Sequence, residues 1–192
     1  AGIECEFGVL KEEGDKLLEP FLIGQKKPFV FFKWAQRLDG TIDNGIISSE
    51  RSREHVHALR DVCDLIVIGG RTVREDRPTL DARLVNGKAP DVLIYSTTDD
   101  FDRTIPLFGV ANRKVFVESS LERIQNYALV MIEGGASMMD ATRDVCDWYV
   151  CYLAPTMGGG SVNMGAVTED FEVLSAKIND NILLWMRKKQ EF

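Results

Sequence analysis

Asp64-Leu65-Ile66-Val67-Ile68-Gly69-Gly70 is the stretch of sequence that decides the fold. Four apolar residues in a row, between an acid and a glycine pair, are typical of a short strand that is buried on both faces. Such strands occur in parallel sheets that helices cover on each side. We therefore expect a strand over residues 64–69 inside an α/β domain.

The segments on either side of this strand alternate between strands and helices. Phe29–Ala35 is a compact aromatic and apolar run that predicts a buried strand, and Glu50–Val62 has helical spacing with Ser49 as its N-cap. A short helix is expected over Arg71–Asp76, ended by Pro78. The remaining expected elements are strands Asp91–Tyr95, Lys114–Glu118, Leu129–Ile132 and Trp148–Leu153, a helix Ser120–Tyr127, and a helix from Ala136 to about Arg143.

This alternation is typical of an α/β fold with a largely parallel sheet. Two late strands, near Phe171–Lys177 and Leu183–Lys188, have the pattern of an antiparallel hairpin. The sequence therefore predicts a three-layer α/β fold. Its mixed, mostly parallel central sheet is flanked by helices and ends in a C-terminal antiparallel hairpin.

The first 27 residues differ from the rest because glycines interrupt any long hydrophobic period. We expect a short strand at Ile3–Val9 and a short helix near Glu12–Leu22. Residues 1–27 are thus interpreted as a tail or linker, and residues 28–192 as the domain. A chain of 192 residues can hold one domain with a sizeable core.

Composition and charge narrow the function. Hydrophobic residues make up 45% of the chain and charged residues 28%, an ordinary globular balance. The net charge of −7 argues against a general nucleic-acid binder, because such proteins meet phosphates with clustered cations. No apolar run reaches the roughly 18 residues of a membrane span. We expect no nucleic-acid partner, no membrane segment and a cytoplasmic location.

The cysteines and histidines form no recognisable metal or disulfide pattern. His55 and His57 lie two residues apart in an expected helix, so they do not share a face. We therefore expect no metal site. The cysteines are interpreted as reduced, small hydrophobic residues; they are Cys5, Cys63, Cys146 and Cys151.

Two glycine pairs follow expected strands and could bring the backbone close to a ligand. Ile132-Glu133-Gly134-Gly135-Ala136 leads into a helix whose first N–H groups suit a pyrophosphate. Gly69-Gly70-Arg71-Thr72 lies at a second strand end. Ligands of open α/β sheets collect beyond the carboxyl ends of strands, so the two turns together favour a nucleotide site. A turn that needs glycine only for its geometry is the alternative.

Hydroxyl and cationic side chains indicate which nucleotide and substrate to expect. Ser96-Thr97 follows a strand and favours NADP over NAD, because hydroxyls suit an extra phosphate. Asp99 and Asp100 oppose this through charge repulsion. Arg83 offers a planar fork suited to a phosphate. A plain polar turn and a solvated arginine are the alternatives.

Lys33 is unusual because it lies in an otherwise apolar strand. Its ammonium should either reach solvent or meet a partner, and Glu133 at another strand end is the candidate. A strand-edge lysine without a role is the alternative.

Several short motifs occur in a specific order and spacing. They are Lys33-x-Ala35-x-x-Leu38-Asp39-Gly40, Ile47-Ser48-Ser49 with Arg53 and Leu59-Arg60, Gly69-x-x-Thr72-Val73-x-x-Asp76-x-Pro78-x-Leu80-x-x-Arg83, Glu133-Gly134-Gly135, and Leu153-Ala154-Pro155 with Gly158-Gly159-Gly160. From residue 28 to about 165, the chain resembles the C-terminal reductase domain of the bifunctional riboflavin-biosynthesis deaminase–reductase. That family has a dihydrofolate-reductase-like fold.

The resemblance implies a role for each site residue. Lys33 would lie near the sugar carbon that receives hydride, and Lys33 and Glu133 are the expected catalytic residues. The NADPH site would be lined by Ala35, Ile46, Thr72, Asp76, Ser96, Gly134, Gly135, Ala136 and Ser137. The substrate would meet Asn44, Arg60, Leu80, Arg83 and Glu133, with an arginine on its ribose phosphate.

The implied reaction reduces the ribosylamino group of a pyrimidine ribosyl 5′-phosphate to a ribitylamino group. The sugar ring opens to expose an aldehyde or imine carbon, which receives hydride from NADPH. The protein aligns donor and acceptor, and Lys33 and Glu133 are hypothesised to stabilise charge or deliver a proton.

The resemblance extends to the linker and to assembly. Residues 1–27 are similar to the junction that follows the deaminase domain, whereas the deaminase signature His-x-Glu with Pro-Cys-x-x-Cys is missing. We therefore expect a reductase portion of a longer protein that is fused to a deaminase domain. The family implies a homodimer, and the apolar strand Val150–Leu153 is expected to be exposed and to take part in it.

One loop departs from the family pattern. Thr41–Ile47 is several residues shorter than in typical members, and Asn44 and Ile46 replace the usual Ser and Trp. Two alternatives stay open. One is a same-fold reductase of a pterin, folate or other small carbonyl substrate, against which Arg60 and Arg83 favour a phosphorylated substrate. The other is a non-catalytic NADP-binding module, which the short loop favours.

Overall fold

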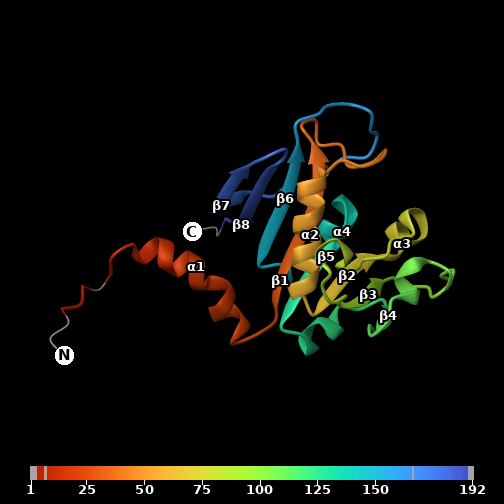
Figure 1. Cartoon of the computed structure of the whole chain (residues 1–192), viewed down its shortest axis with the longest axis horizontal. Helices are drawn as coiled ribbons and strands as arrows, with labels where there is room; N and C mark the ends of the chain where they lie inside the picture. Colours follow the sequence, from red (N-terminus) through yellow and green to blue (C-terminus); the bar gives the residue numbers. More distant parts are fainter. Residues whose placement is uncertain (1–3, 7, 166, 190–192) are drawn as a thin grey trace.

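The computed structural model describes residues 4–6, 8–165 and 167–189 of the chain. Its centre is an eight-stranded sheet with the order β4-β3-β2-β5-β1-β6-β8-β7 (Figure 1). The strands are β1 (Phe29–Arg37), β2 (Leu65–Gly69), β3 (Asp91–Tyr95), β4 (Val115–Glu118), β5 (Leu129–Glu133), β6 (Trp148–Ala154), β7 (Phe171–Ile178) and β8 (Ile182–Lys188).

The neighbouring strands from β4 across to β6 all run parallel. β8 pairs antiparallel with β6, and β7 pairs antiparallel with β8. This arrangement confirms the mixed, mostly parallel sheet with a C-terminal antiparallel hairpin. β1 continues to Arg37, two residues beyond the predicted end, because its last residues pair with the end of β6.

Helices connect these strands much as the sequence predicts. The Ser49 hydroxyl accepts a hydrogen bond from the Ser52 N–H at 3.2 Å and so caps α2 at the predicted residue. The helix predicted over residues 120–127 is instead a short 3₁₀ turn. Among the described residues, none of the helices combines the length and apolarity needed to cross a membrane. The helices are α1 (Lys11–Gly24), α2 (Glu50–Val62), α3 (Gly70–Asp76) and α4 (Ala136–Thr142), with 3₁₀ turns η1 (Arg83–Val85), η2 (Pro106–Gly109) and η3 (Glu122–Asn126).

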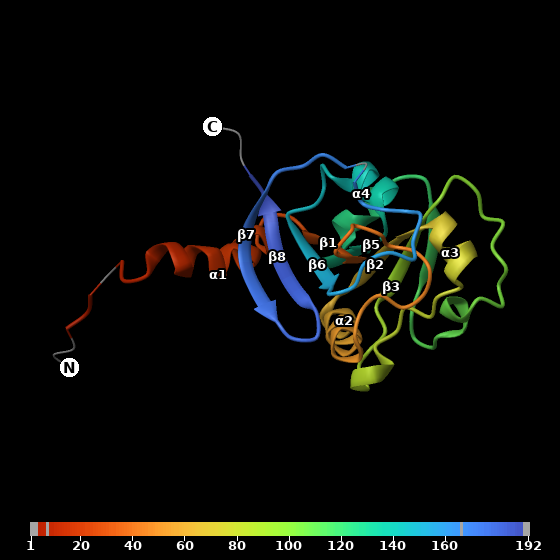
Figure 2. The same ribbon diagram turned by 90° about the horizontal axis from the view of Figure 1, so that it is seen from above.

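The sheet separates two hydrophobic clusters and so forms the middle of three layers. Side chains alternate along β1, so Phe31 packs with Val56 of α2 on one face. Phe32 packs with Met138 of α4 on the other face. Figure 2 shows α2 and α4 on opposite sides of the sheet. The predicted three-layer architecture is therefore confirmed.

The residues before β1 form α1, which projects from the sheet domain (Figure 1). This confirms the predicted helix. The strand predicted over Ile3–Val9 is wrong for residues 4–6, 8 and 9, none of which is in a strand; Ile3 and Phe7 lie outside the described residues. Gly8 has a φ of +85° and Leu10 a φ of +51°, and such left-handed residues turn an extended backbone.

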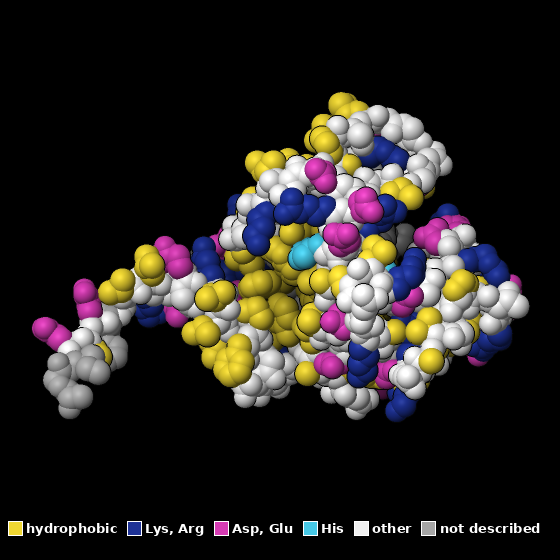
Figure 3. Space-filling model, in the orientation of Figure 1, with side chains coloured by type: hydrophobic (Ala, Val, Ile, Leu, Met, Phe, Trp, Pro, Cys, Tyr) yellow, Lys and Arg dark blue, Asp and Glu magenta, His cyan; other side chains and the backbone are white. Residues whose placement is uncertain are grey.

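The expectation that strand Val150–Leu153 is exposed is wrong. β6 lies between β1 and β8, and Val150 and Tyr152 are 0% and 1% exposed. The antiparallel hairpin covers the edge that would otherwise be open. Large exposed apolar side chains lie instead on α1, where Leu17 is 81% and Phe21 64% exposed. Figure 3 shows a further apolar area of the surface between α1 and α2. The homodimer itself stays a prediction.

Candidate functional site

The carboxyl end of β5 lies beside the middle of β1, near the centre of the sheet. Lys33 of β1 and Glu133 of β5 are partners in the parallel register. Because side chains alternate along a strand, Lys33 lies on the same face as Phe31, the face that α2 covers. Lys33 Nζ donates to Glu133 Oε2 at 3.4 Å, and both side chains are largely buried. Glu133 is thus confirmed as the partner that the sequence indicates for Lys33.

Arg60 of α2 completes a buried group of charges. Its Nε donates to Glu133 Oε1 at 2.9 Å, and its Nη2 donates to Glu133 Oε2 at 3.1 Å. Burial alone would raise the pKa of the Glu133 carboxyl, but Arg60 and Lys33 outweigh burial and lower this pKa to about 2. Glu133 is therefore a carboxylate at neutral pH that holds two cations in place. We refer to Lys33, Arg60 and Glu133 as the central cluster.

Asp81 connects the central cluster to Arg83. Arg60 Nη1 donates to the Asp81 backbone oxygen at 3.4 Å, and Arg83 Nη1 donates to the Asp81 carboxylate at 2.6 Å. His57 Nδ1 is buried 3.8 Å from the same carboxylate and has no hydrogen-bond partner among the described residues. Burial, followed by the charge of Arg60, lowers the pKa of His57. The Arg83 side chain is 59% exposed, so its guanidinium is accessible to solvent and to ligands.

The segment that leads to Arg83 has an uncommon backbone. Leu80 is buried and has a φ of +55°, in the left-handed region that bulky residues rarely adopt. Arg113 holds this segment, because its guanidinium donates to the Thr79 backbone oxygen at 2.8 Å and to the Leu80 backbone oxygen. Burial lowers the pKa of Arg113 to about 10. Strain of this kind gathers at functional sites, and here it sets the path of the chain into η1.

Ala35 and Tyr152 extend the α2-facing side of the central cluster. Ala35 of β1 is the register partner of Tyr152 of β6, and Lys33 Nζ lies 6.0 Å from the centre of the Tyr152 ring. The Tyr152 hydroxyl forms a hydrogen bond of 2.7 Å with His55 Nδ1. Burial raises the pKa of the Tyr152 hydroxyl, which therefore keeps its proton at neutral pH. Ala35, a predicted cofactor contact, thus lies next to the cluster.

Both predicted glycine turns follow neighbouring strands, β2 and β5, at the carboxyl edge. A Cβ on Gly70 would lie 2.8 Å from the Cβ and Oγ of Ser96, so this glycine lets the start of α3 approach the end of β3. A Cβ on Gly134 would lie 2.5 Å from Met138 Cβ. A glycine is therefore needed at position 134 for the packing of α4 against the turn that precedes it, whether or not a ligand binds there.

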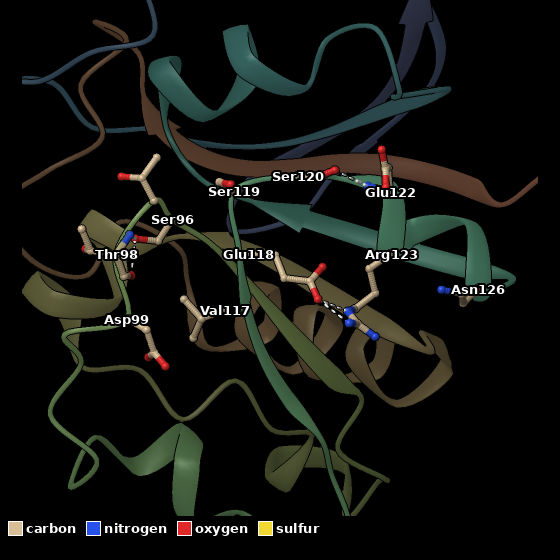
Figure 4. Close-up of a pocket in the computed structure, with 11 residues that line it drawn as sticks. Ser96, Thr98, Asp99, Val117, Glu118, Ser119, Ser120, Glu122, Arg123 and Asn126 are labelled. Carbon is tan, nitrogen blue, oxygen red and sulfur yellow. Dashed lines mark hydrogen bonds and ion pairs between the residues drawn. The ribbon is translucent and has the colours of Figure 1, made fainter.

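A cavity of about 750 Å³ opens beyond the carboxyl ends of β3 and β4 (Figure 4). We call it the β3–β4 cavity. Ser96, a predicted cofactor contact, lines it, and the Ser96 hydroxyl donates to the Thr98 backbone oxygen at 2.9 Å. On the opposite wall, Arg123 of η3 donates to the Glu118 carboxylate at 2.8 Å and stacks 3.8 Å from the centre of the Phe116 ring. The cavity thus combines hydroxyls with an arginine–glutamate pair.

The remaining predicted cofactor contacts lie on the two short helices that follow the glycine turns. Thr72 and Asp76 belong to α3, and Ala136 and Ser137 open α4. Burial, followed by the charge of Glu75, raises the pKa of the Asp76 carboxyl. Within the described ranges, no group of three or more His, Cys, Asp and Glu side chains could hold a metal ion.

The short loop Thr41–Ile47 is held against the loop that follows β6. The buried Arg37 guanidinium donates to the backbone oxygens of Asp43, at 2.8 Å, and Asn44, at 2.9 Å. Asn44 has a φ of +58°, and its side-chain amide donates to the Gly159 backbone oxygen. Arg37 therefore fixes the path of this short loop.

Two predicted contacts on this loop lie apart from the central cluster. Asn44 is engaged with Gly159, and the Ile46 side chain is 74% exposed. The loop reaches the glycine turn after β5 through another residue, because a Cβ on Gly135 would lie 2.6 Å from Ile42 Cδ1. The roles of Asn44 in substrate binding and of Ile46 in cofactor binding stay predictions.

Several residues of this edge carried no signal of their own in the sequence. Asp81 occupies a variable position of the motif that contains Leu80 and Arg83. Glu118 and Arg123 lie five residues apart, which is not a spacing that pairs side chains on a helix. Only the turn into η3 brings that pair together, so the ion pair could not be predicted from the sequence without the structure.

The arrangement offers places for a dinucleotide and for a phosphorylated sugar at one edge of the sheet. The close approach at Gly70 and the β3–β4 cavity fit a nucleotide, which needs backbone proximity and a hollow beyond parallel strands. Lys33 and Ala35 present a cation beside a small side chain at the sheet centre. Arg83 presents a planar fork for a phosphate.

Comparison with known proteins agrees with this arrangement. Residues 28–181 match the family described as RibD C-terminal domain. The riboflavin biosynthesis protein RibD of Synechocystis is 35% identical over 132 residues, which cover 64% of this chain and 36% of that protein. The chain spans only about a quarter to a half of the curated relatives, between 26% and 54% for two further RibD proteins.

Solved structures show the same likeness. The diaminohydroxyphosphoribosylaminopyrimidine deaminase/5-amino-6-(5-phosphoribosylamino)uracil reductase of Thermotoga maritima has a TM-score of 0.77 at 26% identity, covering 98% of this chain and 65% of that one. Dihydrofolate reductase of Enterococcus faecalis, complexed with NADP(H), shares the fold, with a TM-score of 0.58 at 13% identity over 84% of this chain and 97% of that one. Because the family match covers more than half of its residues, the chain belongs to the RibD C-terminal domain family, the pyrimidine reductases of riboflavin biosynthesis with a dihydrofolate-reductase-like fold.

Proposed function

We propose that this chain reduces the ribosylamino group of a pyrimidine ribosyl 5′-phosphate to a ribitylamino group. Family membership supports the reaction class, and the similar Thermotoga maritima protein is named a 5-amino-6-(5-phosphoribosylamino)uracil reductase. The observation that carries the proposal for this chain is the central cluster, in which the buried carboxylate at the carboxyl end of β5 holds a lysine ammonium of the neighbouring parallel strand β1.

The reaction needs an electrophilic carbon, a hydride and a proton. Opening of the ribosyl ring exposes an imine or aldehyde carbon, and the nicotinamide cofactor, when bound, supplies the hydride to it. Addition of hydride to this carbon places negative charge on the neighbouring nitrogen or oxygen unless a proton is delivered there. A positioned cation or acid lowers that barrier. Lys33 is our candidate, because its ammonium can both stabilise the charge and donate a proton.

Glu133 and Arg60 act as positioning residues in this proposal. With a pKa of about 2, Glu133 carries no proton to donate near neutral pH. Arg60 holds both oxygens of Glu133, so the carboxylate cannot turn away from Lys33. Each of the three guanidinium nitrogens of Arg60 already donates to Glu133 or Asp81, which favours this role over the substrate contact expected from the resemblance.

Arg83 is our candidate for the substrate phosphate. It is exposed, and its present partner is the Asp81 carboxylate at 2.6 Å. A phosphate of higher charge can compete for the guanidinium and bind it through two parallel hydrogen bonds. Asp81 also contacts Arg60 through its backbone, so the phosphate would bind close to the central cluster.

The hydride donor is a reduced nicotinamide dinucleotide, since reductases of this family typically use NAD(P)H. NADPH is the form that Ser96 and Thr97 favour in the sequence. Ala35 and the Gly134–Gly135 turn would hold the nicotinamide end near Lys33. Both NADPH and NADH therefore belong in the assay.

The test is turnover of the Lys33→Ala protein. Aminated and deaminated pyrimidine ribosyl phosphates are offered in parallel, with either dinucleotide, and the loss of reduced nicotinamide is followed. We expect kcat to fall by about 10²-fold or more, the usual contribution of a general acid. Lys27→Ala is the matched control, because Lys27 also pairs with an acid, Asp147, but lies before the amino end of β1.

Each outcome separates the candidate functions. Unchanged turnover of the Lys33→Ala protein would remove this lysine from the mechanism. Dinucleotide binding by the unmodified chain, without turnover of either pyrimidine, would favour the non-catalytic module. Preferred turnover of a pterin, folate or simple carbonyl would favour the other reductase.

Two expectations about assembly belong to the same proposal. Residues 1–27 would connect the reductase to a preceding deaminase domain, and the chain would form a homodimer. The exposed apolar side chains of α1, including Leu17 and Phe21, offer a surface for such contacts. Sedimentation of the chain, alone and with Leu17→Ser and Phe21→Ser, would show whether dimerisation needs this surface.

A further inference from the structure

The β3–β4 cavity carries a charge that bears on the choice between NADPH and NADH. Its lining includes three acids, Asp99, Glu118 and Glu122, and one cation, Arg123. Three carboxylates and one guanidinium give the lining a net charge of −2, or −1 when Arg103, which pairs with Asp99 from outside the lining, is included. The 2′-phosphate that distinguishes NADPH from NADH would add about −1.5 to −2 at neutral pH. Like charges in one cavity repel each other, so this lining opposes the phosphate.

The arginine of the cavity is engaged by a neighbouring acid. Both Nε and Nη2 of Arg123 donate to the same Glu118 oxygen (Figure 4). The guanidinium also stacks on the Phe116 ring, 3.8 Å from its centre. Glu118 therefore both neutralises Arg123 and fixes the direction in which its guanidinium points.

One hydroxyl of the cavity and two arginines near it are also engaged. The Ser96 hydroxyl, on which the expectation of NADPH rests, donates to the Thr98 backbone oxygen and accepts from the Thr98 N–H. Nearby arginines are paired with acids, in the ion pairs Arg74–Asp100 and Arg103–Asp99. A 2′-phosphate would therefore have to displace an acid before it reached one of these arginines, and what the lining offers it instead are neutral groups such as Thr97 and Ser119.

The position of the cavity suits the adenosine half of a dinucleotide. From β1, which carries Lys33, to β4 the sheet crosses β5, β2 and β3, which is four strand spacings or about 19 Å. An extended dinucleotide with its nicotinamide beside Lys33 can span this distance along the carboxyl edge. Its path passes Gly70, where the backbone of α3 lies against Ser96. This step rests on the proposed function.

We propose that the β3–β4 cavity disfavours the 2′-phosphate, so that this chain uses NADH at least as efficiently as NADPH. We assign the setting of this preference to Glu118, which holds Arg123 away from the ligand.

The test uses two probes that differ only in the 2′-phosphate, AMP and adenosine 2′,5′-bisphosphate. Calorimetric titration of the full chain should show that it binds the bisphosphate no more tightly than AMP. Glu118→Gln keeps the size of the side chain, removes its charge and releases Arg123. We expect this substitution to raise the affinity for the bisphosphate relative to AMP about tenfold, a change of ~1.4 kcal/mol. Arg123→Gln should move the ratio in the opposite direction.

Controls separate the local pair from the overall charge. Glu172→Gln changes the net charge by the same amount, and Glu172 pairs with Arg187 on the far hairpin at a similar exposure. It should leave the ratio unchanged. Raising the salt concentration should increase relative binding of the bisphosphate to the unmodified chain, because salt screens the repulsion. In turnover, the ratio of kcat/KM for NADPH to that for NADH should follow the same order.

Three results would overturn the inference. In the first, the unmodified chain binds the bisphosphate at least about tenfold more tightly than AMP. In the second, Glu118→Gln leaves the ratio of the two affinities unchanged. In the third, neither nucleotide binds. Absence of turnover with either dinucleotide, together with the expected order of binding, would count against the proposed function alone.

Discussion

Two arginine–glutamate pairs stand at the same edge of this sheet and differ in how much water reaches them. The side chains of Arg60 and Glu133 are 13% and 11% exposed, whereas those of Arg123 and Glu118 are both 30% exposed. In each pair the arginine donates through two nitrogens to its partner. The chemistry is therefore alike, and the surroundings are what distinguish the two.

The difference shows what each pair can do. A buried charge has lost its water, so the fold depends on its partner, and breaking such a pair is costly. A more exposed pair contributes little to stability and can be rearranged by a ligand. The centre of the edge is therefore rigid, where we propose that hydride transfer needs fixed groups. The β3–β4 end is more exposed, and there we propose that a change of charge alters the cofactor preference.

Neutralising each glutamate tests this comparison most directly. Glu133→Gln leaves Arg60 and Lys33 buried without a counter-charge, and we expect it to lower the free energy of unfolding by about 4 kcal/mol. Glu118→Gln should lower it by less than about 1 kcal/mol, the usual worth of an exposed pair. Urea-induced unfolding at neutral pH measures both. Equal losses would show that burial does not separate the pairs.

The dependence of stability on pH is the second test. The pKa of Glu133 is lowered from 4.5 to about 2 in the folded chain. A carboxyl with a lowered pKa stabilises the fold above its unfolded pKa, and this contribution is lost as pH falls towards the folded pKa. Between pH 4.5 and 2 this group should account for a loss of about 3 kcal/mol.

Comparison of the unmodified chain with its Glu133→Gln variant isolates this contribution from those of other carboxyls. The difference in unfolding free energy between the two should shrink as pH falls through that window. For Glu118→Gln the difference should stay small throughout. A constant difference for Glu133→Gln would contradict the lowered pKa.

The central cluster could be predicted in part because burial constrains it. A lysine in an apolar strand needs a partner, and the end of β5 supplied Glu133, as the hydrogen bond between them confirms. Arg60 was expected as a contact of the substrate, a role that stays a prediction. Its bidentate pairing with Glu133 depends on how α2 lies over β5, which helical periodicity does not specify.

Other features could not be predicted because local sequence does not constrain them. The apolar pattern of Val150–Leu153 is the same for an open edge strand and for one that β8 covers, and only the later hairpin decides between them. The Glu118–Arg123 pair is partly solvated, so no cost of burial required a partner for either residue. Gly134 fits both a ligand and the packing of α4, and its sequence alone does not separate these reasons.

The contact between Gly70 and Ser96 lies between the central cluster and the β3–β4 cavity. Substitutions there are expected to change the free energy of unfolding by less than either test of Glu133 does. A methyl group on Gly70 would lie 2.8 Å from Ser96 Cβ, which cannot rotate away as the end of a long side chain would. We expect Gly70→Ala to cost about 1.5 kcal/mol, within the usual range for overpacking. Ser96→Gly removes the opposing atoms, so the double variant should be more stable than Gly70→Ala alone.

A double-mutant cycle on unfolding free energies measures this coupling, which should reach about 1 kcal/mol. If the contact only shapes the fold, restoring stability with Ser96→Gly should also restore AMP binding by the Gly70→Ala chain. If the Ser96 hydroxyl also contributes to the β3–β4 cavity, the double variant should be stable yet bind AMP more weakly. Additive effects on stability would mean that α3 shifts to accept the methyl group. Gly70 and Ser96 would then not be energetically coupled, despite their contact.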